Sequence, residues 1–234
     1  MQAQDTAMAY FFKLWSWVEA NAKHVFIGAG ILAVAIVLAS YYFWRQNQTE
    51  IIAGQALTQL LISTPPNSDA GQLANAYLKI AADYSDTQTG GRALMLGATT
   101  LFESGKYPEA QAQFKKYLDQ HSADTFSAQA ALGVAACLDA QGQMDPAASA
   151  YRRVISGFSD PNAVDAARYA LAKINEQQGK LADAENLYGT VARNNPNTPL
   201  GSEAAFRAVQ LRAKLPPTTP PKTPPTSFNP GTKP

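Results

Sequence analysis

Cysteine is almost absent from this chain. Cys137 is the only cysteine among 234 residues, so neither an intramolecular disulfide nor a CxxC metal or redox site can form. Histidine is nearly as rare, because the chain holds only His24 and His121, in no spacing typical of metal ligands. We therefore expect neither a metal nor a cofactor.

Net charge and catalytic motifs are also lacking. The 19 basic and 18 acidic residues give a formal charge of +1, which produces no long-range field and argues against nucleic acid as a partner. The sequence contains no GxGxxG or GxxxxGK[ST] phosphate loop and no GxSxG nucleophile motif. Its acidic residues are scattered singly, so no carboxylate pair for acid–base chemistry is visible. We expect that the protein is not an enzyme.

One long apolar run lies near the start of the chain. Residues 25–44 read VFIGAGILAVAIVLASYYFW, twenty residues without a charge. As a helix they extend about 30 Å, the thickness of the hydrocarbon core of a bilayer. The run ends in Tyr41, Tyr42 and Trp44, which suit the membrane interface. We expect a transmembrane helix; a buried helix of a soluble protein and a cleaved signal peptide are the alternatives.

The segment before this run does not resemble the short basic start of a signal peptide. Residues 1–24 contain FFKLWSW, which favours an uncleaved segment lying in the membrane interface. Lys13 and Lys23 precede the run, whereas Arg45 is the only basic residue in the twenty that follow it. This bias favours a cytoplasmic N-terminus.

A repeat with a period of 37 residues follows the apolar run. Three columns recur at this spacing, which indicates a repeat rather than a coincidence. An aromatic column holds Tyr77, Phe114, Tyr151 and Tyr188; an alanine column holds Ala56, Ala93, Ala130, Ala167 and Ala204; a third holds Ile80, Tyr117, Val154 and Val191.

Each copy of the repeat alternates between helix and break. Stretches such as GRALMLGATTLFES and YPEAQAQFKKYL carry apolar residues at helical spacing. Gly105, Gly142 and Gly179 fall between the two helices of a copy, where a left-handed residue can end the first one. Pro108 and Pro146 fall in the first turn of the second helix, where a missing N–H is harmless.

Stacked hairpins bury together the apolar stripe that a single hairpin leaves exposed. We therefore predict an all-α fold for residues 45–214, an α-solenoid of four to five helical hairpins preceded by one transmembrane helix. An unrelated alanine-rich bundle is the alternative. The final residues, 215–234, hold eight of the fifteen prolines, which predicts a solvated extension. A spacer is favoured there over an SH3-type ligand.

The order Gly105, Tyr107, Ala110 and Phe114 resembles the tetratricopeptide repeat, and Pro196 stands where that repeat ends its second helix. The usual unit has 34 residues; the longer period resembles a variant of bacterial envelope proteins. The resemblance covers roughly residues 54–214. It implies a domain that binds other proteins and leaves the partner open.

The N-terminus narrows the resemblance. An FF…ANAK lead, a glycine-bearing span and then helical repeats resemble the ancillary subunit of the bacterial Sec translocon. That family implies a single-pass inner-membrane protein with its repeats on the exported, periplasmic side and a chaperone-like association with secreted chains. Its partners would be translocon subunits, exported polypeptides or envelope proteins. The alternative function is a scaffold in envelope assembly or cell division with one dedicated partner.

The resemblance also implies where a partner binds, because the first helix of each hairpin lines the groove of such a solenoid. The surface is mixed, with apolar side chains and charges of both signs, which suits varied segments. For each residue, packing within the solenoid is the alternative role. The predicted groove positions are Arg92, Met95, Thr99, Phe102, Gln129, Leu132, Ala136, Asp139, Tyr169, Lys173 and Glu176.

Overall fold

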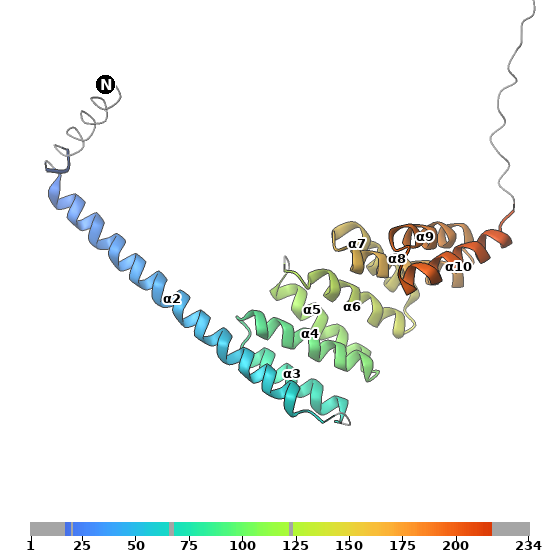
Figure 1. Ribbon diagram of the computed structural model, residues 1–234, viewed down its shortest axis with the longest axis horizontal. Coiled ribbons are helices and arrows are strands. Elements are labelled where there is room, and N and C mark those ends of the chain that lie inside the picture. The colour runs from blue at the N-terminus through green and yellow to red at the C-terminus, as the bar shows by residue number, and fades with distance from the viewer. Residues whose placement is uncertain (1–16, 20, 66–67, 122–123, 217–234) are drawn as a thin grey trace, which may run out of the picture. The chain divides into compact units, whose positions relative to one another are not determined.

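The computed structural model describes residues 17–19, 21–65, 68–121 and 124–216, and within these ranges it is helical without any strand (Figure 1). The interfacial segment predicted for residues 1–24 and the tail predicted for residues 215–234 lie mostly outside the described residues. The chain divides into two compact units. The first comprises Met1–Ser68 and Asn75–Ala93, and the second comprises Asp69–Ala74 and Leu94–Pro234.

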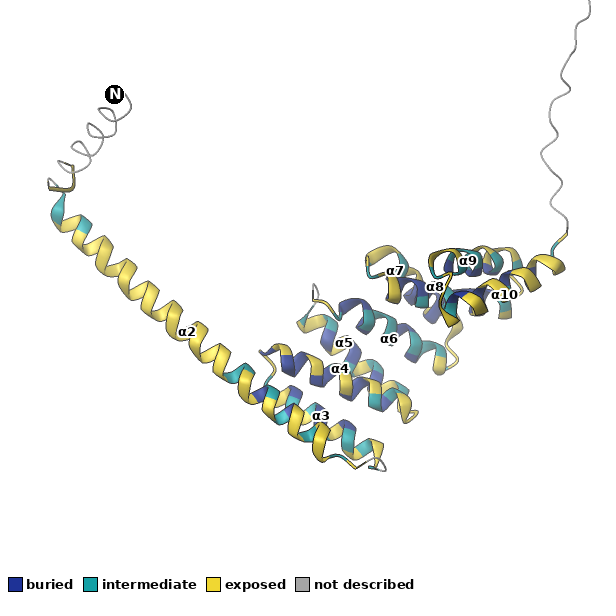
Figure 2. Cartoon of the chain, viewed as in Figure 1, coloured by how far each residue is buried: buried dark blue, intermediate teal, exposed yellow. Residues whose placement is uncertain are grey.

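The first unit contains one helix that is much longer than the others. Helix α2 runs without a break over Ala22–Ser63, 42 residues, or about 63 Å at 1.5 Å per residue. The apolar run 25–44 lies inside it and stays exposed, as the yellow colouring of α2 in Figure 2 shows. Beyond the run, α2 turns Ala53 and Leu57 inward. One continuous helix therefore carries both the apolar run and the first packing residues of the repeat region.

A carboxylate of α2 caps another helix of the same unit. Helix α4 covers Gln88–Glu103, and the backbone N–H groups of Gln88 and Thr89 donate to the two oxygens of Glu50 at 2.8 and 2.9 Å. The Thr89 hydroxyl donates to the same carboxylate at 2.6 Å. A negative charge is favourable at a helix N-terminus, where backbone N–H groups lack partners within the helix. Glu50 therefore fixes the start of α4 against α2.

Replacing Glu50 with alanine is expected to loosen the first turn of α4. Losing a capping acceptor typically destabilises a helix start by about 1–2 kcal/mol. The measurement is hydrogen exchange at the amides of residues 88–92, which should open more readily by that amount. Asp119→Ala, at an exposed carboxylate, serves as the control, and equal protection in both variants would contradict the capping role.

The second unit is a row of antiparallel helices. Helix α3, Ala70–Asp83, and α4 each run through the boundary between the units, and the remaining helices belong to the second unit alone. From α5 to α10 each helix contacts the next one along the chain, as expected for a solenoid. These helices are α5 Tyr107–Gln120, α6 Ser127–Ala140, α7 Met144–Gly157, α8 Pro161–Gln177, α9 Leu181–Asn194 and α10 Pro199–Lys214.

The turns within the hairpins have the predicted geometry. Gly105, Gly142 and Gly179 have φ values of 79°, 74° and 73°, in the left-handed region that glycine tolerates best. Pro108 and Pro146 fall at the second and third residues of α5 and α7. The same turn therefore closes α4–α5, α6–α7 and α8–α9, and α10 begins a further copy that has no described second helix.

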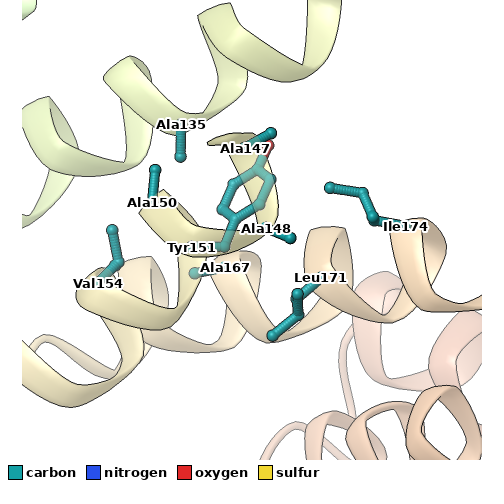
Figure 3. Packing of buried hydrophobic residues seen from close by; sticks show 9 residues of the cluster. All are labelled: Ala135, Ala147, Ala148, Ala150, Tyr151, Val154, Ala167, Leu171 and Ile174. Carbon is teal, nitrogen blue, oxygen red and sulfur yellow. The ribbon is translucent and has the colours of Figure 1, made fainter. Parts of the chain in front are cut away.

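The repeated columns form the core. The four residues of the aromatic column are at most 6% exposed, and four of the five residues of the alanine column are fully buried. Ala56 is only half-buried, because α2 turns Ala53 and Leu57 inward instead. Figure 3 shows the ring of Tyr151 surrounded by small and branched side chains of α6, α7 and α8. Alanine at these positions lets the helices approach closely, and the aromatic ring fills the space beside it.

Enlarging one of these alanines is expected to overpack the contact. Ala147 is fully buried in the cluster around Tyr151, so Ala147→Leu should lower the free energy of unfolding by about 1–3 kcal/mol. Urea unfolding followed by circular dichroism measures the change. Ala182→Leu, at an exposed position of α9, should have a midpoint equal to wild type. A wild-type midpoint for Ala147→Leu would show that this contact tolerates the extra volume.

Candidate functional site

The predicted groove residues all lie on α4, α6 and α8, the first helices of successive hairpins. Arg92 is exposed and belongs to the first compact unit; the other positions belong to the second. In the second unit α6 contacts α8 directly as well as through α7, so two of the first helices are true neighbours. Among these positions Thr99 and Lys173 are exposed, and the remainder are half-buried.

An aromatic and acidic cluster occupies the C-terminal part of this surface. The rings of Tyr169 on α8 and Tyr188 on α9 meet edge to face with centroids 5.2 Å apart. The Tyr188 hydroxyl donates to Glu176 at 3.3 Å. Tyr169 in turn hydrogen-bonds Glu203 of α10, so three helices contribute to one cluster. We call Tyr169, Glu176, Tyr188 and Glu203 the tyrosine–glutamate cluster.

The environment keeps the phenols of this cluster protonated. Burial raises the pKa of Tyr169 to about 12, and its hydrogen bond to Glu203 adds to the increase. Burial and the negative charge of Glu176 raise the pKa of Tyr188 further. Both side chains therefore stay neutral hydroxyl donors at physiological pH. Tyr169, half-buried, presents an apolar ring with a polar edge, a combination that is common at protein interfaces.

Other predicted positions are partly used by the solenoid itself. Phe102 packs its ring against Tyr107 of α5, with centroids 5.2 Å apart, and remains half-buried. Leu132 packs against the core cluster around Tyr151. Gln129 donates from Nε2 to Asp160 at 2.6 Å, while its Oε1 is buried without a hydrogen-bond partner. These residues therefore lie on the predicted binding surface and also contact neighbouring helices of the solenoid.

Sequence reasoning did not extend the groove to α10. Adding one period to Tyr169 reaches Phe206, which is 62% exposed. The 37-residue spacing contained this signal. Glu203 of the tyrosine–glutamate cluster, one period after Ala166, could have been found in the same way.

Cys137 and His121, whose side chains could carry out chemistry, have structural roles in the fold. Cys137 is fully buried, and burial raises the pKa of its thiol to about 11, so the nucleophilic thiolate is disfavoured. His121 is the C-cap residue of α5, with its ring centroid 4.7 Å from that of Tyr117. Within the described residues, no three His, Cys, Asp or Glu side chains gather in a way that could hold a metal ion.

One helix of the described chain is long and apolar enough to cross a membrane. It is α2, whose most apolar window has a mean hydropathy of 2.2 and no buried side chain. The exposed large side chains along it include Phe26, Ile31, Val37 and Trp44. Length and composition alone give this result, which a signal sequence would also give.

Two family models match the chain. One, described as a tetratricopeptide repeat-like domain, matches residues 15–154, and another, described as a tetratricopeptide repeat, matches residues 140–202. No curated protein matches the sequence.

Several solved structures match part of the chain. The type III secretion chaperone SycD of Yersinia enterocolitica, in complex with a peptide of the translocator YopD, is 24% identical over 53% of this chain and 92% of its own, with a TM-score of 0.45. PcrH from Pseudomonas aeruginosa is 19% identical over 53% of this chain and 93% of its own, with a TM-score of 0.45. The TPR-like repeats of a kinesin light chain of Podosopora anserina are 13% identical over 72% of this chain and 85% of their own, with a TM-score of 0.50.

Proposed function

Because the chain belongs to the tetratricopeptide repeat-like domain family, we propose that it is a membrane-anchored protein-binding module that holds or hands over newly exported polypeptides near the secretion channel. Residues 25–44 of α2 anchor it in the bacterial inner membrane with the N-terminus in the cytoplasm. The repeats lie on the exported side, and the first helices of their hairpins bind the client.

The exposed apolar side chains of α2 are the observation that supports a membrane anchor. The most apolar window of this helix has no buried side chain, so its apolar surface needs a cover that the described chain does not supply. A bilayer supplies such a cover over about 30 Å, which matches the uncharged run 25–44. Tyr41, Tyr42 and Trp44 then lie where the apolar run meets water.

The surface of the first helices supports the binding part of the proposal. Half-buried apolar and aromatic side chains, Met95, Phe102, Leu132 and Tyr169, lie there with Asp139, Lys173 and Glu176. Aromatic side chains with polar edges are enriched where proteins bind one another. Charges of both signs without a basic cluster suit extended or helical segments of differing sequence better than one fixed terminal carboxylate.

Protease accessibility tests the location. We expect protease to digest the repeat domain of the full-length protein only after the outer barrier of the cell is opened, leaving a protected N-terminal fragment. Protection of the repeats until the inner membrane is lysed would place them in the cytoplasm and contradict binding of exported clients. A chain without any membrane association would contradict the anchor itself.

Photo-crosslinking tests the binding surface. A photoreactive amino acid at Phe102, Leu132 or Tyr169 should capture exported polypeptides at least fivefold more than one at Lys115 or Arg152, which are exposed on the second helices α5 and α7. Equal capture at both sets of positions would contradict a groove on the first helices.

The number of partners separates the proposal from the alternative, a scaffold with one dedicated partner. A surface that accepts many clients should tolerate Phe102→Ala, whereas a dedicated interface should lose about 2 kcal/mol or more at an anchor residue. The measurement is the set of proteins crosslinked at Tyr169 in the Phe102→Ala variant. Equal, severe loss of every partner would favour the scaffold.

A further inference from the structure

Two large apolar side chains on the outer face of α10 are exposed and have no partner among the described residues. This last helix turns Ala204, Ala208 and Leu211 toward α9 and leaves its other side exposed. Phe206 and Val209, at 62% and 69% exposure, stand at the centre of the exposed side. A terminal repeat in a solenoid normally has a polar outer face, so α10 departs from the rule.

The repeat period shows what α10 lacks. Val209 stands one, two and three periods after Ala172, Ala135 and Ala98, all of which are fully buried. Those alanines belong to first helices that have both a second helix and a following repeat to cover them. Among the described residues, no second helix and no following repeat cover α10 in this way, so its exposed side is open to a partner.

We propose that a second copy of this protein covers this face, with the two α10 helices packed antiparallel. Ser202, Phe206, Val209 and Ala213 follow a 4–3–4 spacing and form one seam along the exposed side of α10, as in a two-stranded coiled coil. A two-fold axis between Arg207 and Ala208 sets Phe206 of each copy opposite Val209 of the other. Each large ring then meets a medium-sized side chain, and Ser202 meets Ala213 at both ends.

The charges of α10 select the antiparallel direction. Glu203 lies near the start of the helix, where it already interacts with Tyr169 and lies 3.8 Å from Arg207 of the same helix. Arg212 and Lys214 lie in the last turn, and Glu203, Arg212 and Lys214 are all exposed. In the antiparallel pair Glu203 is level with Arg212 of the second copy, so the acidic end of each helix faces the basic end of the other. A parallel pair would set like charges level with one another. The opposed helix dipoles also favour the antiparallel pair.

The contact area of α10 is small, so the two copies should pair only where their local concentration is high. The 16 residues of α10 are about 24 Å long, and a strip about 10 Å wide covers roughly 240 Å² on each copy, well below the roughly 800 Å² per partner of a standard stable complex. Such a contact needs a high local concentration, which two chains anchored in one membrane provide. This step rests on the anchor proposed above, whereas the register of the pair does not.

Disulfide crosslinking of the full-length protein in liposomes tests the pair. Ser202→Cys and Ala213→Cys are small changes at exposed positions, and the native Cys137 is buried. Mixed in one membrane under mild oxidation, the two variants should form the mixed disulfide at least fivefold faster than a mixture of Ser202→Cys with Ala182→Cys. Faster self-crosslinking of Ser202→Cys or Ala213→Cys than of the mixture would indicate a parallel pair and overturn the proposal.

Two further variants identify the occupant of the face. Phe206→Lys, introduced into both cysteine variants, should reduce the mixed disulfide at least fivefold, whereas Met144→Lys, at a 41% exposed apolar residue of α7, should leave it unchanged.

Removal of residues 217–234 should leave the crosslink intact. A face occupied by the chain's own terminal residues would instead give a mixed disulfide only after this truncation, and a partner of another kind would give none with purified protein; either result overturns the proposal. Binding of exported clients at α4, α6 and α8 is read separately by the photo-crosslinks at Phe102, Leu132 and Tyr169, so the two proposals can fail independently.

Discussion

The Asp165→Ala variant is expected to lose about 3 kcal/mol of unfolding free energy. Asp165 is only 3% exposed, and its carboxylate accepts hydrogen bonds from Arg168 at 2.6 Å, Asn194 at 3.0 Å and Asn195 at 2.8 Å. These bonds tie α8 to the end of α9 and the residue that follows it. Removing the acceptor leaves a cation and two amides without their shared partner, which costs several times a single hydrogen bond. Urea unfolding monitored by circular dichroism measures the loss.

The pH dependence of stability provides an independent check on Asp165. Burial alone would raise the pKa of this carboxyl group, but hydrogen bonds from Asn194, Arg168 and Asn195 outweigh it and lower the pKa below the ordinary 3.8. A group with a depressed folded pKa stabilises the fold above its unfolded pKa and loses that contribution as pH falls through the folded value. The difference in stability between wild type and Asp165→Ala should therefore shrink below about pH 4. A difference that stays constant to pH 2 would contradict the charge as the source.

Ionisation of three buried tyrosines is expected to remove about 4 kcal/mol from the stability of the repeat domain at pH 11 relative to pH 9, in addition to the contributions of Tyr169 and Cys137, whose pKa values are also raised. Tyr117, Tyr151 and Tyr188 are each at most 3% exposed. Burial, first, and nearby carboxylates, second, raise the pKa of all three phenols above the ordinary 10.0. Between pH 10 and the raised values the folded state binds more protons than the unfolded state, so stability falls as pH rises. Each residue contributes about 1.4 kcal/mol at pH 11.

Tyrosine-to-phenylalanine variants assign this alkaline loss to particular residues. Tyr151→Phe removes a titrating group and keeps the ring, so the drop in stability between pH 9 and pH 11 should shrink by about 1.4 kcal/mol. Tyr41→Phe, at an exposed residue of α2, is the control and should leave the drop unchanged. Chemical unfolding at fixed pH values measures the drop. Equal drops in wild type and Tyr151→Phe would show that this phenol ionises without unfolding.

The repeat could be predicted from the sequence because its physical causes are local and recur. A glycine with positive φ follows α4, α6 and α8, and alanine recurs at close contacts between helices. Gly105, Gly142 and Gly179 confirm the first pattern, and the fully buried Ala130, Ala167 and Ala204 confirm the second. Ala56 is the one alanine of its column that is not fully buried, because α2 turns Ala53 and Leu57 inward instead.

Contacts between distant polar residues could not be predicted in the same way. Glu50 reaches the start of α4 across 38 and 39 residues, and no local pattern relates the two. Asp165 gave one sign that was overlooked. At the 37-residue spacing, the positions before Asp165 are Gly91 and Ala128, which are small residues. A carboxylate that replaces a small buried residue needs hydrogen-bond partners, because burying an unpaired charge is costly. Its partners Asn194 and Asn195 are 29 and 30 residues away.

The predicted groove was carried over by position alone, and the structure adds which positions also have packing roles. Leu132 contributes to the core and Gln129 to the contact with Asp160, so neither is free of the solenoid. Tyr169 belongs to a cluster whose other members come from α8, α9 and α10, and sequence spacing does not reveal such a junction. Which of these residues a client touches stays a prediction that the photo-crosslinks address.

The unbroken helix α2 sets a mechanical limit on an anchored protein. If residues 25–44 cross the bilayer, the 19 residues from 45 to Ser63 continue the same rod for about 28 Å beyond it. A helix of this kind holds its own far end, at Ser63, at a set height above the lipid surface, and any tilt of the membrane span moves that end sideways. Inserting a few glycines after Arg45 would remove this constraint while leaving both the span and the repeats unchanged in sequence.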